Sequence, residues 1–147
     1  MESLRELVSG LFSKDNNAAY ACLKRLLDES SASGAVYPYF DTFAEMLGSD
    51  NSYLRTRGMF LIAANAPWDV DNRIDEILPA YLALIEDDKP ITARQCIQTL
   101  PDLARHKPDL APQIRLALLG AKPGKYKPTM QPLVQKDIAQ ALQRIQG

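Results

Sequence analysis

The sequence has few of the residues on which metal sites and redox sites depend. It contains one histidine and two cysteines in 147 residues. Zinc sites normally need three or four histidine and cysteine ligands, and iron–sulfur clusters need several thiolates. Cys22 and Cys96 each lie in an apolar helical pattern with no second ligand at metal-binding spacing, so we expect reduced cysteines in the core. The sequence therefore predicts no metal and no other cofactor.

Catalytic motifs are also missing. The chain has no metalloprotease, hydrolase, P-loop or dinucleotide-binding signature. Its one histidine, His106, falls at the end of a predicted helix, where a partly cationic imidazole is better suited to capping than to catalysis. We therefore predict that the protein is not an enzyme.

No apolar run approaches the roughly 18 residues that can span a bilayer. The first residues, MESLRELVSGLFS, carry acidic side chains, unlike a secretory leader. We expect a cytoplasmic protein with no membrane partner. A chain of 147 residues can bury one continuous core, so we predict a single domain over residues 1–147.

The charge is nearly balanced overall but unevenly distributed. The formal net charge is −1, yet residues 1–90 carry 8 basic and 15 acidic side chains, whereas residues 91–147 carry 9 basic and 3 acidic ones. Opposite charges on the two ends can steer a charged partner or favour head-to-tail self-association.

What the sequence does have is helical periodicity, with almost no strand signal. Apolar residues recur every three or four positions, and polar breaks such as SKDNN, ESSASG and GSDNS separate the segments. Pro79 lies within one such pattern, which continues beyond it, so we expect a kink and not a helix end. The prediction is an all-α fold with helical hairpins at about 2–31, 36–66, 72–106 and 109–146.

The hairpins repeat at a spacing of about 40 residues. A shift of 39 residues places Leu54, Arg55, Gly58 and Leu61 on Ala93, Arg94, Ile97 and Leu100, and a shift of 42 places the latter on Gln135, Lys136, Ala139 and Leu142. This overlay predicts equivalent positions in successive second helices.

One segment resembles a complete HEAT repeat. ILPAYLALIEDDKPITARQCIQTL has Leu78-Pro79 in the first helix, an acidic turn at Asp87 and Asp88, and Arg94 early in the second helix. DNSYLRTRGMFLIAANA is similar to the turn and second helix of another. The resemblance implies an α-α superhelix, a short HEAT- or armadillo-like solenoid of about four hairpins.

The run KPITARQCI also resembles a family of small bacterial proteins sometimes loosely labelled as related to the SufB and SufD scaffold of iron–sulfur assembly. Two separated cysteines do not supply the thiolates that such a cluster would need.

The HEAT resemblance implies a structural role for Arg55, Arg94 and Lys136. An arginine at this position would brace the hairpin corner by reaching Asp50, or Asp87 and Asp88, and nearby carbonyl groups. The alternative is a positive ladder that contacts an anionic partner. Arg57 has no counterpart in the overlay, so we expect it to be solvated.

The overlay also predicts a binding face on the second helices. Three registers lie away from the predicted core, and their members are Thr56, Gln95 and Asp137; Met59, Gln98 and Gln140; and Ala63, Asp102 and Arg144. A polar face rich in glutamine suits a peptide or helix better than an apolar small molecule. We therefore predict a non-catalytic interaction module or scaffold for an unidentified protein or peptide, with Thr56, Met59, Gln95, Gln98, Asp137 and Gln140 at the contact; the alternative is plain solvent exposure.

Nucleic-acid binding is the alternative function. The loop at 120–128 carries Lys122, Lys125 and Lys127 around Tyr126, and such residues can contact a phosphate backbone and a base. Some DNA glycosylases are HEAT-like and use Trp and Asp, but the only tryptophan here, Trp68, is better explained by packing. A solvated connector punctuated by prolines is the simpler interpretation of this loop.

Overall fold

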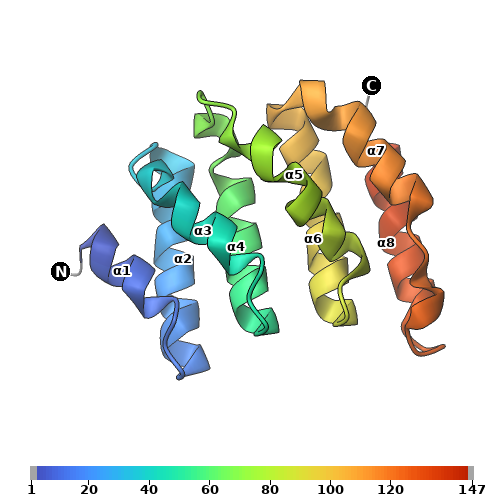
Figure 1. Ribbon diagram of the computed structural model, residues 1–147, viewed down its shortest axis with the longest axis horizontal. Helices are drawn as coiled ribbons and strands as arrows, with labels where there is room; N and C mark the ends of the chain where they lie inside the picture. The colour runs from blue at the N-terminus through green and yellow to red at the C-terminus, as the bar shows by residue number, and fades with distance from the viewer. Residues whose placement is uncertain (1–2, 146–147) are drawn as a thin grey trace. The chain divides into compact units, whose positions relative to one another are not determined.

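The computed structural model describes residues 3–145 and shows an all-α protein (Figure 1). The described residues form eight α-helices and five short 3-10 helices joined by turns, and they contain no strand. The all-α prediction is therefore confirmed. The chain divides into two compact units, Met1–Asn72 and Arg73–Gly147, which we call the first and second units.

The first unit contains two helical hairpins. They are formed by α1 (Leu4–Gly10) with α2 (Asn16–Ala32), and by α3 (Phe40–Met46) with α4 (Ser52–Ala64). The 3-10 helix Tyr37–Tyr39 leads into α3, and another at Ala66–Trp68 follows α4. Figure 1 shows α2 and α4 side by side, and the two helices pack against each other.

Polar side chains fix where three of these helices begin. Ser3 accepts a hydrogen bond from the Glu6 amide, Asp15 accepts from the first turn of α2, and Asn51 accepts from the Tyr53 amide. Each cap satisfies amide groups that have no partner inside the helix. The polar breaks in the sequence therefore become helix starts. The apolar stripes that follow form the core of Leu7, Leu11, Leu26, Phe40, Phe43, Met59, Leu61 and Ile62.

Trp68 has the packing role expected of it. Its indole Nε1 donates to the Ser30 carbonyl at 2.7 Å, and its ring carbons lie 3.6 Å from where a Cβ on Gly34 would be. Nearby, the Tyr37 hydroxyl donates to Oδ1 of Asp69 at 2.6 Å. These contacts join the end of α2 to the segment that follows α4.

The second unit also contains two hairpins. Its helices are α5 (Arg73–Ala83), α6 (Pro90–His106), α7 (Ala111–Gly120) and α8 (Gln131–Arg144), with 3-10 helices at Leu84–Glu86, Pro108–Leu110 and Pro123–Lys125. Pro79 lies inside α5 and does not end it, as expected, and α6 likewise continues past Pro101. The core includes Ile74, Leu78, Tyr81, Cys96, Ile97, Leu100, Ile114 and Leu118.

Both cysteines are free thiols. Cys96 is fully buried, as predicted, and burial first, then the charge of Asp87, raises the pKa of its thiol. Cys22 is only half-buried. Lys107, at the end of α6, pairs with Asp75 in the first turn of α5 at 3.1 Å.

The helix starts correct the predicted overlay by one residue, because the N-caps Asn51, Lys89 and Met130 of α4, α6 and α8 lie 38 and 41 residues apart. A shift of 38 residues places the buried Gly58, Met59 and Ile62 on the buried Cys96, Ile97 and Leu100. A shift of 41 then places Cys96, Leu100 and Ala104 on Asp137, Ala141 and Ile145, all buried as well. The predicted shifts of 39 and 42 set the buried Met59 against the exposed Gln98 and Gln140. One residue is about 100° of helical rotation, which is enough to exchange core for surface.

Within residues 3–145, no helix has the length and hydropathy that crossing a membrane requires.

Candidate peptide-binding groove in the second unit

A surface groove runs between α6 and α8. One hollow of about 350 Å³ is lined by Gln98, Pro101, Asp137, Gln140, Ala141, Gln143 and Arg144. A second, of about 420 Å³, is lined by Pro101, Asp102, Ala104, Arg105, Pro108, Arg144 and Ile145. Because the two hollows share Pro101 and Arg144, they form one continuous depression, which we call the α6–α8 groove.

The groove exists because α6 and α8 pack through small and aliphatic side chains. The helices are neighbours in the second unit, as Figure 1 shows. Each presents a buried face, which includes Ile97 and Leu100 on α6 and Val134 and Ala141 on α8. Their polar residues then lie along the two rims. Arg115 supports the end of α8 by donating to the carbonyls of Leu142 and Ile145 at 3.0 and 3.1 Å.

An ion pair lies beside the groove floor. Arg94 Nε donates to Asp137 Oδ2 at 2.6 Å, and the Asp137 side chain is only 6% exposed whereas that of Arg94 is 31% exposed. The hydrogen bond that Arg94 donates to this carboxylate raises the pKa of Arg94, against the opposing effect of burial. The pair neutralises the Asp137 carboxylate, so the hollow around it presents amides and the Arg144 cation to a ligand.

This ion pair corrects two sequence predictions. Arg94 was expected to brace the acidic turn at Asp87 and Asp88, but its guanidinium lies against Asp137 of α8 instead. Asp137 was expected to contact a partner, but it is buried. The residues are 43 positions apart, so no local pattern joins them.

Arg55 and Arg57, both on α4, also differ from each other. Arg55 does brace its corner, because Nη1 donates to the carbonyls of Ser49 and Asp50 at 3.0 and 3.2 Å. Arg57, which was expected to be solvated, is buried and donates to the Leu11 carbonyl at 2.9 Å. Lys136, grouped with these arginines by the overlay, is exposed.

The structure brings together only part of the predicted contact face. Gln98 and Gln140 are exposed and both line the α6–α8 groove. Thr56 and Gln95 are half-buried, and neither lines the groove. Met59 is fully buried, so its prediction as a contact residue is wrong. It falls in the core because the overlay was displaced by one residue.

Sequence reasoning left Gln143 and Arg105 out of the contact face. Gln143 lies three residues after Gln140, and Arg105 lies three residues after Asp102, with which it pairs at 3.2 Å. Residues three apart share a helix face. Extending each predicted position by one turn would therefore have included both residues.

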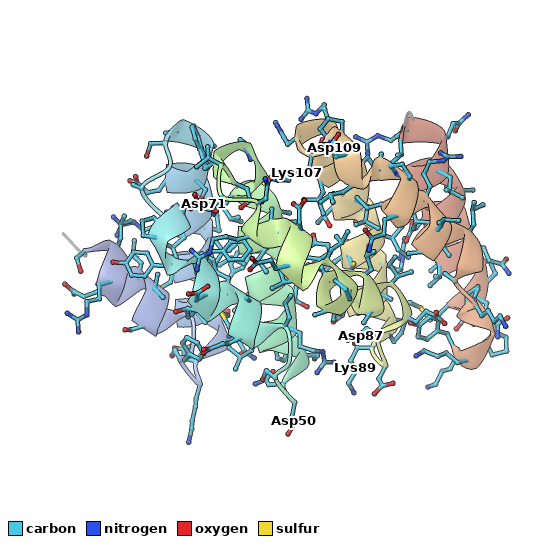
Figure 2. All side chains as sticks on the ribbon, turned by 45° about the horizontal axis from the view of Figure 1, so that its top comes forward. Asp50, Asp71, Asp87, Lys89, Lys107 and Asp109 are labelled. Atoms are coloured by element: carbon cyan, nitrogen blue, oxygen red, sulfur yellow. The ribbon has the colours of Figure 1, made fainter. Side chains whose placement is uncertain are left out.

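The basic loop at 120–128 does not hang free. Tyr126 is buried, and its hydroxyl donates to the Asp87 carbonyl, while Lys125 Nζ donates to the Glu86 carbonyl and lies 3.8 Å from Oδ1 of Asp88. Asp87 and Lys89 mark this turn between α5 and α6 in Figure 2. The solvated-connector interpretation is therefore wrong for Tyr126, which packs onto the acidic turn, whereas Lys125 bonds to that turn but stays exposed. Lys122 and Lys127 are exposed.

The Tyr126 contact predicts a specific pH dependence. Burial, followed by the nearby charges of Asp87, Glu86 and Asp88, raises the pKa of Tyr126 to about 12 in the folded protein, above the ordinary value of about 10. Folding therefore favours the neutral phenol. Its contribution to the free energy of unfolding is fully present below about pH 10 and is lost as the pH rises towards 12.

We expect Tyr126→Phe to lower the free energy of unfolding by about 1 kcal/mol at pH 8, because one hydrogen bond is lost. The difference in stability between the variant and the unmodified protein should shrink at pH 11. Only the unmodified protein loses stability there, because phenylalanine cannot ionise. Thermal denaturation at both pH values measures this. If the stabilities of the variant and the unmodified protein changed in parallel between pH 8 and pH 11, Tyr126 would not be buried as a neutral phenol.

Fold and groove together define an all-α protein of packed helical hairpins with a polar groove on one unit. Within the described residues, no three His, Cys, Asp or Glu side chains are placed to hold a metal ion. No protein-family model matches the chain, and no curated protein sequence matches it.

Proposed function

We propose that this chain is a cytoplasmic, non-catalytic interaction module built from HEAT-like hairpins, and that the α6–α8 groove binds an extended segment of a partner protein. The single observation that supports this is the continuity of the two hollows between α6 and α8, which gives an open groove and not an enclosed pocket. An open groove suits an extended chain that lies along it, whereas small ligands are usually enclosed by concave apolar sites.

The chemistry of the rims suits a peptide backbone. Gln98, Gln140 and Gln143 each carry an amide that can donate and accept hydrogen bonds, as a peptide group does. Arg144 is exposed, and no acidic group among the described residues pairs with it. A partner segment with an acidic side chain near Arg144 would complement this charge.

The test is capture of partners from cells of the source organism by the tagged full-length chain. In the double variant Gln98→Lys and Gln140→Lys, two added cations and lost amides should reduce the amount of captured partner by about tenfold or more. Gln113→Lys, at an exposed position of α7, is the matched control and should capture as much as the unmodified chain.

Partner capture that survives the double substitution would refute the groove as the binding site. A gel mobility-shift assay with duplex DNA tests the alternative function, nucleic-acid binding. Binding that depends on phosphate contacts should be detectable at low salt and should weaken steeply as the salt concentration rises. A salt-sensitive shift in the double variant and the unmodified chain alike would favour a nucleic-acid binder over a peptide binder.

A further inference from the structure

One end of the α6–α8 groove is cationic. The hollow of about 420 Å³ is lined by two arginines from different helices, Arg105 of α6 and Arg144 of α8, and by one acidic residue, Asp102. We call it the arginine hollow. The hollow of about 350 Å³ carries three glutamine amides, and Arg94 neutralises its Asp137, so we call it the glutamine hollow. The groove therefore changes along its length from uncharged amides to guanidinium groups.

Both arginines of the arginine hollow are available to an anionic ligand. Arg105 Nη2 lies 3.2 Å from Asp102 Oδ1, but the two side chains are 70% and 62% exposed. Exposed ion pairs of this kind contribute little to stability, so a carboxylate of a ligand can replace Asp102. Arg144 is exposed and forms no ion pair within residues 3–145.

Arg144 is not needed at the end of its own helix. The last carbonyl groups of a helix carry a partial negative charge, which a cation often neutralises. In α8 this role belongs to Arg115 of α7, which donates to the carbonyls of Leu142 and Ile145 at 3.0 and 3.1 Å. The guanidinium of Arg144 therefore keeps its donors for a ligand.

The floor of the arginine hollow is apolar. Pro101, Ala104 and Ile145 are buried and line the hollow, together with the exposed Pro108. A ligand that enters the hollow therefore meets guanidinium donors beside apolar surface. This combination suits an acidic side chain that is next to an aliphatic one, because the acid can accept charge-assisted hydrogen bonds while the aliphatic group covers the floor.

The distribution of charge along the groove favours a peptide over a nucleic acid. A phosphate backbone carries a charge at every nucleotide and binds along a continuous row of cations, whereas the glutamine hollow is largely uncharged. A peptide can be acidic in one part only. Gln98 and Arg105 are seven residues apart on α6, which is about 10 Å along the helix, and an extended peptide covers this distance in about three residues.

We propose that the groove binds a peptide segment whose acidic side chain, next to an aliphatic one, lies against Arg105 and Arg144. An uncharged polar part, about three residues away, lies against the glutamines. This inference rests on the proposed function, since it assigns the charge pattern of the partner segment in the same groove. Each guanidinium can donate two parallel hydrogen bonds to a carboxylate, so the acidic residue fixes the position of the segment.

The experiment is an NMR titration of the full-length chain with the blocked octapeptide Gln-Ser-Leu-Glu-Glu-Leu-Ser-Gln, whose pattern is the same in both chain directions. Amide chemical shifts should change at residues 98–108 and 137–145. The same peptide with glutamine in place of both glutamates should bind at least about tenfold more weakly. Arg105→Gln and Arg144→Gln should each raise the Kd of the acidic peptide about tenfold, and Arg144→Lys should raise it less, because it keeps the charge but loses the planar fork.

Lys136→Gln is the matched control for the loss of a positive charge. Lys136 is an exposed residue of α8 that lines neither hollow, so its substitution should leave the Kd unchanged. The three substituted side chains are all exposed, so none of these changes should prevent folding. If Lys136→Gln raised the Kd as much as Arg144→Gln, the peptide would be attracted by general charge and the proposal would be overturned.

Gln98→Ala combined with Gln140→Ala separates this inference from the proposed function. If the acidic and neutral peptides bound equally well and only this double variant weakened them, the groove would remain a peptide site and the charge pattern would be refuted. Absence of shift changes at millimolar acidic peptide would also refute the charge pattern, whereas the proposed function would still depend on partner capture. Duplex DNA binding that Arg105→Gln and Arg144→Gln abolish would assign the arginines to phosphate groups and overturn the proposal.

Discussion

Replacement of Arg57 by alanine should lower the free energy of unfolding by about 3 kcal/mol. Arg57 is 6% exposed, and its guanidinium donates to the Leu11 carbonyl and to Asn16. Its removal leaves the buried carbonyl without a donor and opens space between α2 and α4, and losses of this kind are among the largest that single substitutions produce. Burial lowers the pKa of Arg57, and nearby Tyr53 partly opposes this, but an arginine remains charged at neutral pH.

Thermal and urea denaturation measure the effect, and two further variants control it. Arg5→Ala removes the same side chain from an exposed position of α1 and should change stability by less than about 0.5 kcal/mol. Arg57→Lys keeps the charge but cannot reach both acceptors with a planar fork, so it should recover only part of the loss. Equal stability of Arg57→Ala and Arg5→Ala would show that the guanidinium does not join these segments.

Gly58→Ala should lower the free energy of unfolding by about 2 kcal/mol, although alanine is the better helix former. A Cβ on Gly58 would lie 2.7 Å from Met46 Cβ and 2.7 Å from the Phe43 carbonyl oxygen. The second of these is backbone and cannot rotate away, so α3 and α4 would have to separate. Overpacking a well-filled core typically costs 1–3 kcal/mol.

The matched control is Gly120→Ala at the end of α7, where a Cβ would meet nothing within 4 Å. Denaturation midpoints should fall for the Gly58 variant and stay level or rise slightly for the Gly120 variant. Were both variants equally stable, the close approach of α3 and α4 would be disproved. Far-ultraviolet circular dichroism should remain helical in each case, because neither substitution removes a cap.

The helices themselves were predictable because their causes are local. Asp15 and Asn51 lie in polar breaks, and each caps the helix that follows. The continuation of α5 through Pro79 was visible as unbroken periodicity. A candidate groove residue such as Gln98 could be found in the same way, since an exposed position recurs every three or four residues along a helix.

The equivalence of the second helices was harder to predict because arginines were matched by type. Arg55 bonds to carbonyls of its own turn, whereas Arg94 bonds to a carboxylate on a neighbouring helix. Aligning the two displaced the overlay by one residue and brought Met59 into the predicted binding face. The N-caps Asn51 and Lys89, 38 residues apart, are a stricter guide than residue type, because a rotation of about 100° per residue separates core from surface.

By itself the sequence determined the all-α class, the caps and the order of the hairpins, since each follows from interactions within a few residues of the chain. Only the tertiary structure decided which polar side chains became internal. Arg57 meets Leu11 across 46 residues, Arg94 meets Asp137 across 43, and Tyr126 meets Asp87 across 39. Such pairs form because packing brings distant segments together, and a buried donor or acceptor must then find its partner there.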